Sequence, residues 1–154
     1  MSFYVNNIVS EDMFEEILAD ERIAIVRFGY AESPECQRLD RMLAALESTV
    51  GRYFAFSAYE TKDVTQKIRK RYEISDETRC ILVFFSQKKP VYVSFCRRPS
   101  YQVSEKFPTL DELFSLLIMV NQGITHRKKI INIYGTYFEG KRGGKKPEAS
   151  EDYE

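Results

Sequence analysis

Residues 23–36 read IAIVRFGYAESPEC, and this stretch decides the fold. Residues 23–28 are apolar and β-branched apart from Arg27, and they are too few for a typical helix, so they predict a strand covered on both faces. Ser33 and Pro34 are typical of a helix start, because serine caps free N–H groups and proline fits the first helical position. The stretch therefore predicts a buried central strand that leads through a short loop into a helix.

The predicted helix start carries half of a redox motif. Cys36 stands where a C-x-x-C motif has its second sulfur, and Ser33 occupies the place of the first. Attack on a disulfide needs a thiolate, and a serine hydroxyl without a general base does not react at a useful rate. The turn therefore resembles the active-site turn of thioredoxin without its reaction.

Helix and strand patterns alternate along the rest of the chain. Apolar spacing and capping residues predict helices after Ser10, Ser33, Asp63 and Thr109, which end near Asp20, at Gly51, near Tyr72 and before Gly123. Further apolar or alternating runs predict strands at residues 53–59, 80–85 and 91–95. The connection of residues 86–90 is too short for a crossover helix, so the last two strands are predicted to form an antiparallel hairpin.

A parallel βαβ half followed by a hairpin and a covering helix is the order of elements in thioredoxin. We therefore predict an α/β, thioredoxin-like fold, with a mixed four- to five-stranded sheet flanked by helices, over residues 1–134. Residues 135–154 are rich in lysine and glycine with an acidic end, and they predict a disordered tail.

Composition limits the class of protein. A chain of 154 residues with 44% apolar residues can bury one sizeable core. It has no apolar run long enough to span a bilayer and no signal-peptide pattern, which favours a soluble intracellular protein. Three cysteines without metal-ligand spacing favour a reducing compartment, with no metal and no cofactor. The lone histidine, His126, lies in a basic segment, which disfavours Cys-His catalysis.

The neutral net charge hides a strong asymmetry. Residues 1–66 carry 6 basic and 12 acidic side chains, residues 67–147 carry 17 and 7, and residues 148–154 carry 4 acids. Such asymmetry is typical of a surface for RNA or a protein partner, although exposed charge without a binding role is the alternative. The candidate binding cations are Arg69, Lys70, Arg71, Lys88, Lys89, Arg97, Arg98, Arg127, Lys128 and Lys129.

Several short segments together resemble a known family. They are IVRFG at 25–29, the pattern Pro34-x-Cys36-x-x-Leu39-Asp40, RYEI at 71–74, VFF at 83–85, and the last helix with the basic residues after it. Over about residues 8–133 the chain resembles the Dim/Dib family, the thioredoxin-like fifteen-kilodalton subunit of the spliceosomal U5 snRNP. A paralogous branch, also linked to splicing, is similar as well.

The resemblance implies a non-enzymatic protein of the nucleus. It implies a structural place in the U4/U6.U5 tri-snRNP, beside the large U5 scaffold protein and near the 5′ splice site until activation. Two features depart from the family pattern: Ser33 stands where an acidic residue is usual, and residues 76–80 lack the proline that shapes the thioredoxin groove. We expect a remodelled groove that binds partners.

The sequence is compatible with more than one role for Cys36. It is a small packing residue, or it forms a disulfide with Cys80, which the fold would place at the same sheet edge. The alternative function is a thiol redox protein or redox sensor that uses Cys36 alone. Such proteins usually keep the first sulfur of the motif, which this chain lacks.

Overall fold

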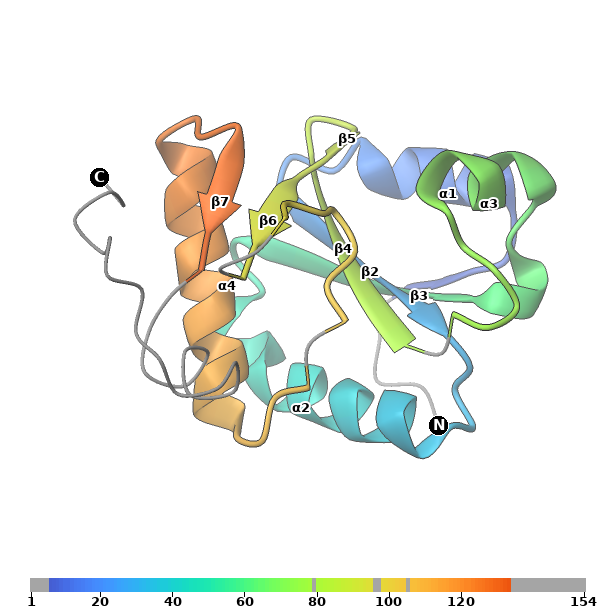
Figure 1. Ribbon diagram of the computed structural model, residues 1–154, viewed down its shortest axis with the longest axis horizontal. Coiled ribbons are helices and arrows are strands. Elements are labelled where there is room, and N and C mark those ends of the chain that lie inside the picture. Colours follow the sequence, from blue (N-terminus) through green and yellow to red (C-terminus); the bar gives the residue numbers. More distant parts are fainter. Residues whose placement is uncertain (1–5, 79, 96–97, 105, 134–154) are drawn as a thin grey trace. The chain divides into compact units, whose positions relative to one another are not determined.

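The computed structural model describes residues 6–78, 80–95, 98–104 and 106–133 (Figure 1). The chain divides into two compact units, of which the first is Met1–Pro90 with Gln102–Lys106 and the second is Val91–Tyr101 with Phe107–Glu154. None of the described helices combines the length and the hydropathy needed to cross a membrane. The single domain expected over residues 1–134 stays a prediction, and the tail at 135–154 lies outside the described residues.

The first unit contains a five-stranded mixed sheet in the order β1-β3-β2-β4-β5. Its strands are β1 (Asn6–Ile8), β2 (Ile23–Gly29), β3 (Phe54–Glu60), β4 (Cys80–Ser86) and β5 (Lys89–Pro90). β3 is parallel to β1 and β2, whereas β4 is antiparallel to β2 and β5. Every residue of β2 is buried, as the apolar run predicted for a central strand.

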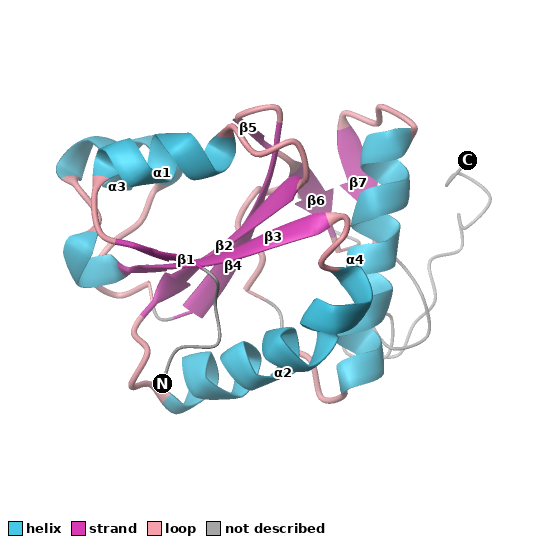
Figure 2. Cartoon of the chain, turned by 180° about the vertical axis from the view of Figure 1, so that it is seen from behind, coloured by secondary structure: helices cyan, strands magenta, loops and turns pink. Residues whose placement is uncertain are grey.

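Helices cover both faces of this sheet. α1 (Glu11–Leu18) and α3 (Gln66–Tyr72) lie on one face and α2 (Pro34–Val50) on the other (Figure 2). A short 3-10 helix, η1 (Thr61–Asp63), joins β3 to α3. The predicted α/β sheet flanked by helices is therefore confirmed, with the larger of the two expected strand numbers.

An aromatic cluster fills the space between α1, α3 and the sheet. The ring of Phe14 on α1 lies 5.5–6.4 Å from the rings of Phe28, Tyr59, Tyr72 and Phe85. Several of these pairs are edge-to-face, the arrangement that the ring quadrupoles favour. Burial of five large rings anchors α1 and α3 on the sheet.

The second unit pairs one helix with a small parallel ribbon. It contains α4 (Leu110–Thr125), β6 (Tyr92–Ser94) and β7 (Ile130–Asn132), and β6 is parallel to β7. Gly123 allows α4 to approach β7 closely, because a Cβ atom there would lie 2.6 Å from Cγ1 of Ile131. The helix was predicted from its Thr109 cap, whose hydroxyl accepts from the N–H of Glu112.

The predicted hairpin is present but differs in its second strand. β4 turns back through Gln87 and Lys88, both at positive φ, into the two-residue β5. This two-residue turn suits the twist of a hairpin. The prediction that residues 91–95 form the second hairpin strand is wrong, because β6 pairs with β7 in the second unit. The sequence pattern of a short apolar strand does not show which strand it pairs with.

Further elements also differ from those predicted by the sequence. β7 was not predicted, and α4 continues through Gly123 to Thr125 instead of ending before Gly123. The helix expected after Asp63 begins at Gln66, because Thr65 supplies the cap by accepting from the N–H of Ile68. The strand β1 was not predicted, since three residues show no periodicity. The other helices begin at their expected caps, Ser10, Ser33 and Thr109.

Candidate functional site

The candidate site lies in the first unit, where β2 ends and α2 begins. Ser33 is the N-cap of α2, and its hydroxyl accepts from the N–H of Cys36 at 3.1 Å. Pro34 follows at the first helical position, as predicted. The residue that replaces the first cysteine of a redox motif therefore stabilises the helix start.

The structure brings together the two cysteines that the predicted fold paired. Cys36 is fully buried in the first turn of α2, and the half-buried Cys80 begins β4. Cys80 lies opposite Gly29 in the antiparallel register of β2 and β4, so it is at the edge from which the site loop leaves. Neither of these two cysteines is in a disulfide in the structure. The disulfide between them stays a prediction.

The environment of the two thiols shifts their pKa values in opposite directions. A hydrogen bond with Cys80 is the largest cause that lowers the pKa of Cys36 to about 7, and the positive charge of Arg27 and the Ser33 hydroxyl act in the same direction. The same thiol pair and burial raise the pKa of Cys80. One sulfur of the pair is therefore readily ionised while the other holds its proton.

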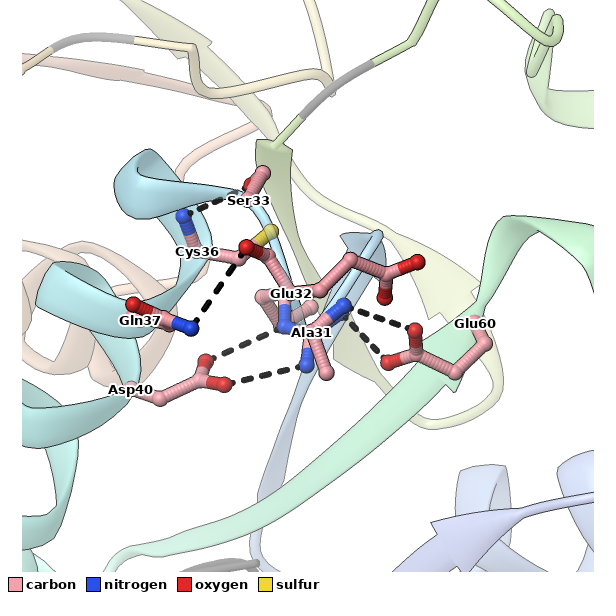
Figure 3. A network of polar contacts seen from close by, with 8 residues as sticks. Ala31, Glu32, Ser33, Cys36, Gln37, Asp40 and Glu60 are labelled. Carbon is pink, nitrogen blue, oxygen red and sulfur yellow. Dashed lines mark hydrogen bonds and ion pairs between the residues drawn. The ribbon is translucent and has the colours of Figure 1, made fainter.

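A buried ion-pair network lies behind the site loop. Arg27 is 1% exposed and donates to both carboxylate oxygens of Asp40 on α2, at 3.1 and 3.0 Å, and to Glu60 at the end of β3, at 2.9 Å. The second oxygen of Glu60 accepts from the N–H of Ala31 at 2.8 Å (Figure 3). One guanidinium therefore connects β2, α2, β3 and the site loop.

This network was not predicted from the sequence. There Arg27 is only the interruption of an apolar strand, and Asp40 is only part of a family pattern. The sequence feature that could have indicated the network is the position of Arg27. A single arginine in a strand buried on both faces requires carboxylate partners from neighbouring elements. Which carboxylates supply them depends on how β3 and α2 pack, and one sequence does not show this.

The candidate binding cations of the first unit have different roles. Arg69 is engaged by protein atoms, because its guanidinium donates to Asp76, Thr61 and Val64 at 2.7, 2.7 and 3.1 Å. It ties α3 to the segments on either side of it and is not an exposed cation. Arg71 lies over the Tyr72 ring, 5.8 Å from its centroid. The remaining members, Lys70, Lys88 and Lys89, are exposed.

The second unit holds the other candidate cations. Arg98, Arg127, Lys128 and Lys129 are all exposed. Arg97 lies outside the described residues. In the part of the chain that the structure describes, no group of three His, Cys, Asp or Glu side chains could hold a metal ion.

These features can be compared with known proteins. The family described as mitosis protein DIM1 matches residues 6–137, which is most of the chain. The chain belongs to the DIM1 family. This match confirms the family resemblance that the Arg-Phe-Gly and Pro-x-Cys patterns indicated.

Two curated proteins are similar to this chain in sequence. The chain is 23% identical over 126 residues to the thioredoxin-like protein 4A homolog of Dictyostelium discoideum, a match that covers 82% of this chain and 66% of the relative. It is 29% identical over 72 residues to the spliceosomal protein DIB1 of Candida glabrata, covering 47% and 49%. The chain thus spans less than two thirds of the length of these relatives.

Solved structures of other proteins have a fold similar to that of this chain. A thioredoxin from Malassezia sympodialis has a TM-score of 0.55 at 14% identity, with 76% of this chain and 90% of that chain covered. A thioredoxin from Plasmodium falciparum has a TM-score of 0.55 at 14% identity, with 74% and 97% covered. These matches confirm the predicted thioredoxin-like fold.

Proposed function

We propose that this DIM1 family member is a non-catalytic component of the splicing machinery. It acts in pre-mRNA splicing as a subunit of the U5 snRNP and the U4/U6.U5 tri-snRNP, in the nucleus, through contacts with spliceosomal proteins such as the large U5 scaffold protein. The name of the Candida glabrata relative supports the splicing role. The finer U5 assignment rests on the family resemblance in the sequence.

One observation carries the non-catalytic part of the proposal. The place of the attacking sulfur is taken by Ser33, whose hydroxyl is used to cap α2, and the remaining sulfur of Cys36 is on a residue with 0% exposure. A disulfide in a protein substrate must reach the attacking thiolate in line with its S–S bond. A buried cysteine in the first turn of the helix does not offer that approach.

Affinity purification tests the splicing role. The tagged full chain, recovered from nuclear extract, is expected to bring U5 proteins and U5 snRNA with it at low salt. A tagged thioredoxin of the same fold is the matched control, because it shares the architecture without the family sequence. Recovery of no spliceosomal protein above this control would reject the proposed function.

A second candidate function has a specific observation in its favour. The pKa of Cys36 lies near 7, so a substantial fraction of this thiol is ionised at neutral pH. A thiol redox protein would use such a sulfur. Reduction of insulin or of a glutathione mixed disulfide above the rate of a Cys36→Ala variant would favour this second function over the first.

We also propose that Cys36 and Cys80 can be joined by oxidation. One molecule of oxidised glutathione would take up the two electrons and the two thiol protons and leave as two molecules of reduced glutathione, and an S–S bond would form between residues that already interact. Thiol alkylation followed by mass measurement is expected to count two fewer free thiols after oxidation than after reduction. Equal counts would contradict the bond, and a Cys80→Ala variant controls for reaction at Cys36 alone.

A further inference from the structure

A row of large side chains, two of them exposed and the third half-buried, crosses the ribbon of the second unit. β6 and β7 pair so that Tyr92 lies opposite Ile130. On the other side of β6, Val93 and Ser100 exchange two backbone hydrogen bonds of 2.9 Å, which makes Tyr101 the antiparallel neighbour of Tyr92. The order across the ribbon is therefore Tyr101, Tyr92, Ile130.

These side chains lie on the outer face of the ribbon. Tyr92 is 43% exposed and Ile130 is 42% exposed, whereas Val93 and Ile131, which alternate with them, are buried. The rings of Tyr92 and Tyr101 are 5.5 Å apart at 65°, so the second ring supports the first from the side. With neighbouring strands about 4.8 Å apart, the row spans about 10 Å.

Exposed cations border this row. The backbone reverses at Arg127, which has a φ of 58°, and the N–H of Lys128 donates to the carbonyl of Gly123 at 2.9 Å. This cap holds Lys128 and Lys129 directly before Ile130 at one end of the ribbon. Arg98 follows the other end of β6, beside the antiparallel segment that leads to Tyr101.

Within the described residues of the second unit, the acidic side chains lie away from the row. Among the described residues of the second unit, the acidic side chains are Asp111 and Glu112, in the first turn of α4. Arg127 follows the opposite end of this 16-residue helix, and a rise of 1.5 Å per residue separates the two ends by about 24 Å. Within the described residues of the second unit, the surface around Tyr92 and Ile130 therefore combines positive charge with apolar side chains.

We infer that the row Tyr101–Tyr92–Ile130, with Arg98 and Arg127–Lys129, binds single-stranded RNA. Bases stack on the exposed ring of Tyr92 and on the apolar surface of Ile130, while the cations at the two ends contact the phosphates. This inference deepens the proposed function and rests on it, because a splicing component works beside unpaired RNA.

The chemistry favours a single strand over a duplex or a protein. A duplex hides its base faces, so it would use the cations without the aromatic row. A protein partner could bind an apolar patch of this size without cations at both of its ends. Unpaired bases need both the flat surface and the positive charge that the ribbon presents.

Fluorescence anisotropy with a labelled strand of about 10 uridines tests the inference on the full chain. Tyr92→Leu is expected to weaken binding by roughly 5-fold to 100-fold, because one stacking surface is removed. Tyr92→Phe keeps the ring and is expected to bind as the unchanged protein does. Tyr53→Leu is the matched control, since Tyr53 is 48% exposed in the first unit.

The role of the cations is tested by salt. Affinity is expected to fall steeply between about 50 and 200 mM salt, and Lys128→Gln with Lys129→Gln should lower the slope of log K against log salt by about 0.7 for each phosphate that is no longer neutralised. Lys62→Gln, an exposed lysine of the first unit, is the matched control. A slope unchanged by the Lys128 and Lys129 substitutions would overturn the inference.

Two further results would also overturn it. One is that the unchanged protein binds no uridine strand at about 50 mM salt. The other is that Tyr92→Leu, with an unchanged circular dichroism spectrum and thermal midpoint, binds the strand as tightly as Tyr92→Phe does.

Purification from nuclear extract separates this inference from the proposed function. Tyr92→Leu is expected to recover the same spliceosomal proteins as the unchanged chain. If the unchanged chain recovers none, the proposed function fails while the measured RNA affinity stands. If Tyr92→Leu loses the proteins and keeps its RNA affinity, the row is a protein-binding surface and the inference is overturned.

Discussion

Arg27 is the residue that the structure around the site depends on most. Its guanidinium is 1% exposed and pairs with two carboxylates from other elements, Asp40 and Glu60. Two carboxylates carry one more charge than the single guanidinium neutralises. The N–H that Ala31 donates to Glu60 stabilises part of this excess negative charge. Removal of one partner would leave buried donors without acceptors, which costs more than the pair itself contributes.

Asp40→Ala is expected to lower the free energy of unfolding by about 3–5 kcal/mol. The reason is that two N–H groups of Arg27 would lose their acceptor in the protein interior. Urea denaturation followed by circular dichroism measures the change. Asp20→Ala is the matched control: Asp20 pairs with the exposed Arg22, and such surface pairs contribute about 1 kcal/mol or less. Equal losses in both variants would contradict the burial argument.

The ionisation of Cys36 depends on its neighbour. Because the hydrogen bond from Cys80 is the largest cause of the lowered pKa, Cys80→Ala is expected to move the pKa of Cys36 from about 7 toward the ordinary value near 9. Cys80→Ser keeps a donor and is expected to leave the pKa low. Titration of thiolate absorbance measures it, with Cys36→Ala to identify the signal. A pKa unchanged by Cys80→Ala would refute the assignment.

The lowered pKa of Cys36 also has a consequence for stability. A group whose pKa is lower in the folded chain stabilises the fold fully above its unfolded pKa, and this contribution is lost as the pH falls toward 7. The raised pKa of Cys80 acts in the opposite sense and destabilises the fold only at higher pH. Stability is therefore expected to rise from pH 7 to about 8.5, with a smaller rise in Cys36→Ala. Urea denaturation of both proteins across this pH range measures the difference.

At the scale of elements, the start of α2 shows how local rules decide structure. Ser33→Ala is expected to cost about 1 kcal/mol, because the N–H of Cys36 loses its acceptor, and to raise the pKa of Cys36, because the Ser33 hydroxyl also contributes to lowering it. Ser33→Asp keeps a capping oxygen and is expected to stay close to the unchanged stability. Urea denaturation and thiol titration of both variants measure these effects. A loss for Ser33→Asp equal to that of Ser33→Ala would contradict the capping role.

The elements that were predicted correctly are those fixed by local chemistry. Ser10, Ser33 and Thr109 cap helices where the sequence indicated, since a cap needs only its own side chain and the next turn. The pairing of residues 91–95 was predicted wrongly, because a short apolar strand carries no information about its partner. The same limit applies to the site: the place of Cys36 beside Cys80 followed from the fold, but the partners of Arg27 depend on packing across three elements.

At the scale of the whole molecule, the structure shows which of the cations in the basic half of the sequence are exposed and which are used within the fold. In the sequence the cations of residues 67–147 form one set, yet Arg69 is used within the fold while Arg127, Lys128 and Lys129 are exposed in the second unit. Sequence alone does not separate an arginine that ties two segments together from a cation that can contact RNA, since both read as polar residues in a basic run. The division into two compact units was likewise not predicted, because both units contribute apolar runs of the same kind.

The two units are expected to differ in local stability. β2 and β3 have seven residues each within a five-stranded sheet, whereas the ribbon of β6 and β7 has three residues in each strand. Small two-stranded ribbons are marginal, so amides of β7 are expected to exchange with solvent faster than those of β2. Hydrogen exchange with mass spectrometry measures both sets in one experiment.

A substitution in each unit makes this difference a test of separate opening. Gly123→Ala would place a Cβ 2.6 Å from buried Ile131, and such overpacking costs about 1–3 kcal/mol, so exchange in β7 is expected to rise while exchange in β2 stays unchanged. Asp40→Ala is expected to do the reverse, because the Arg27 network lies within the first unit. If either substitution accelerates exchange equally in both strands, the units open together and the chain behaves as one cooperative domain.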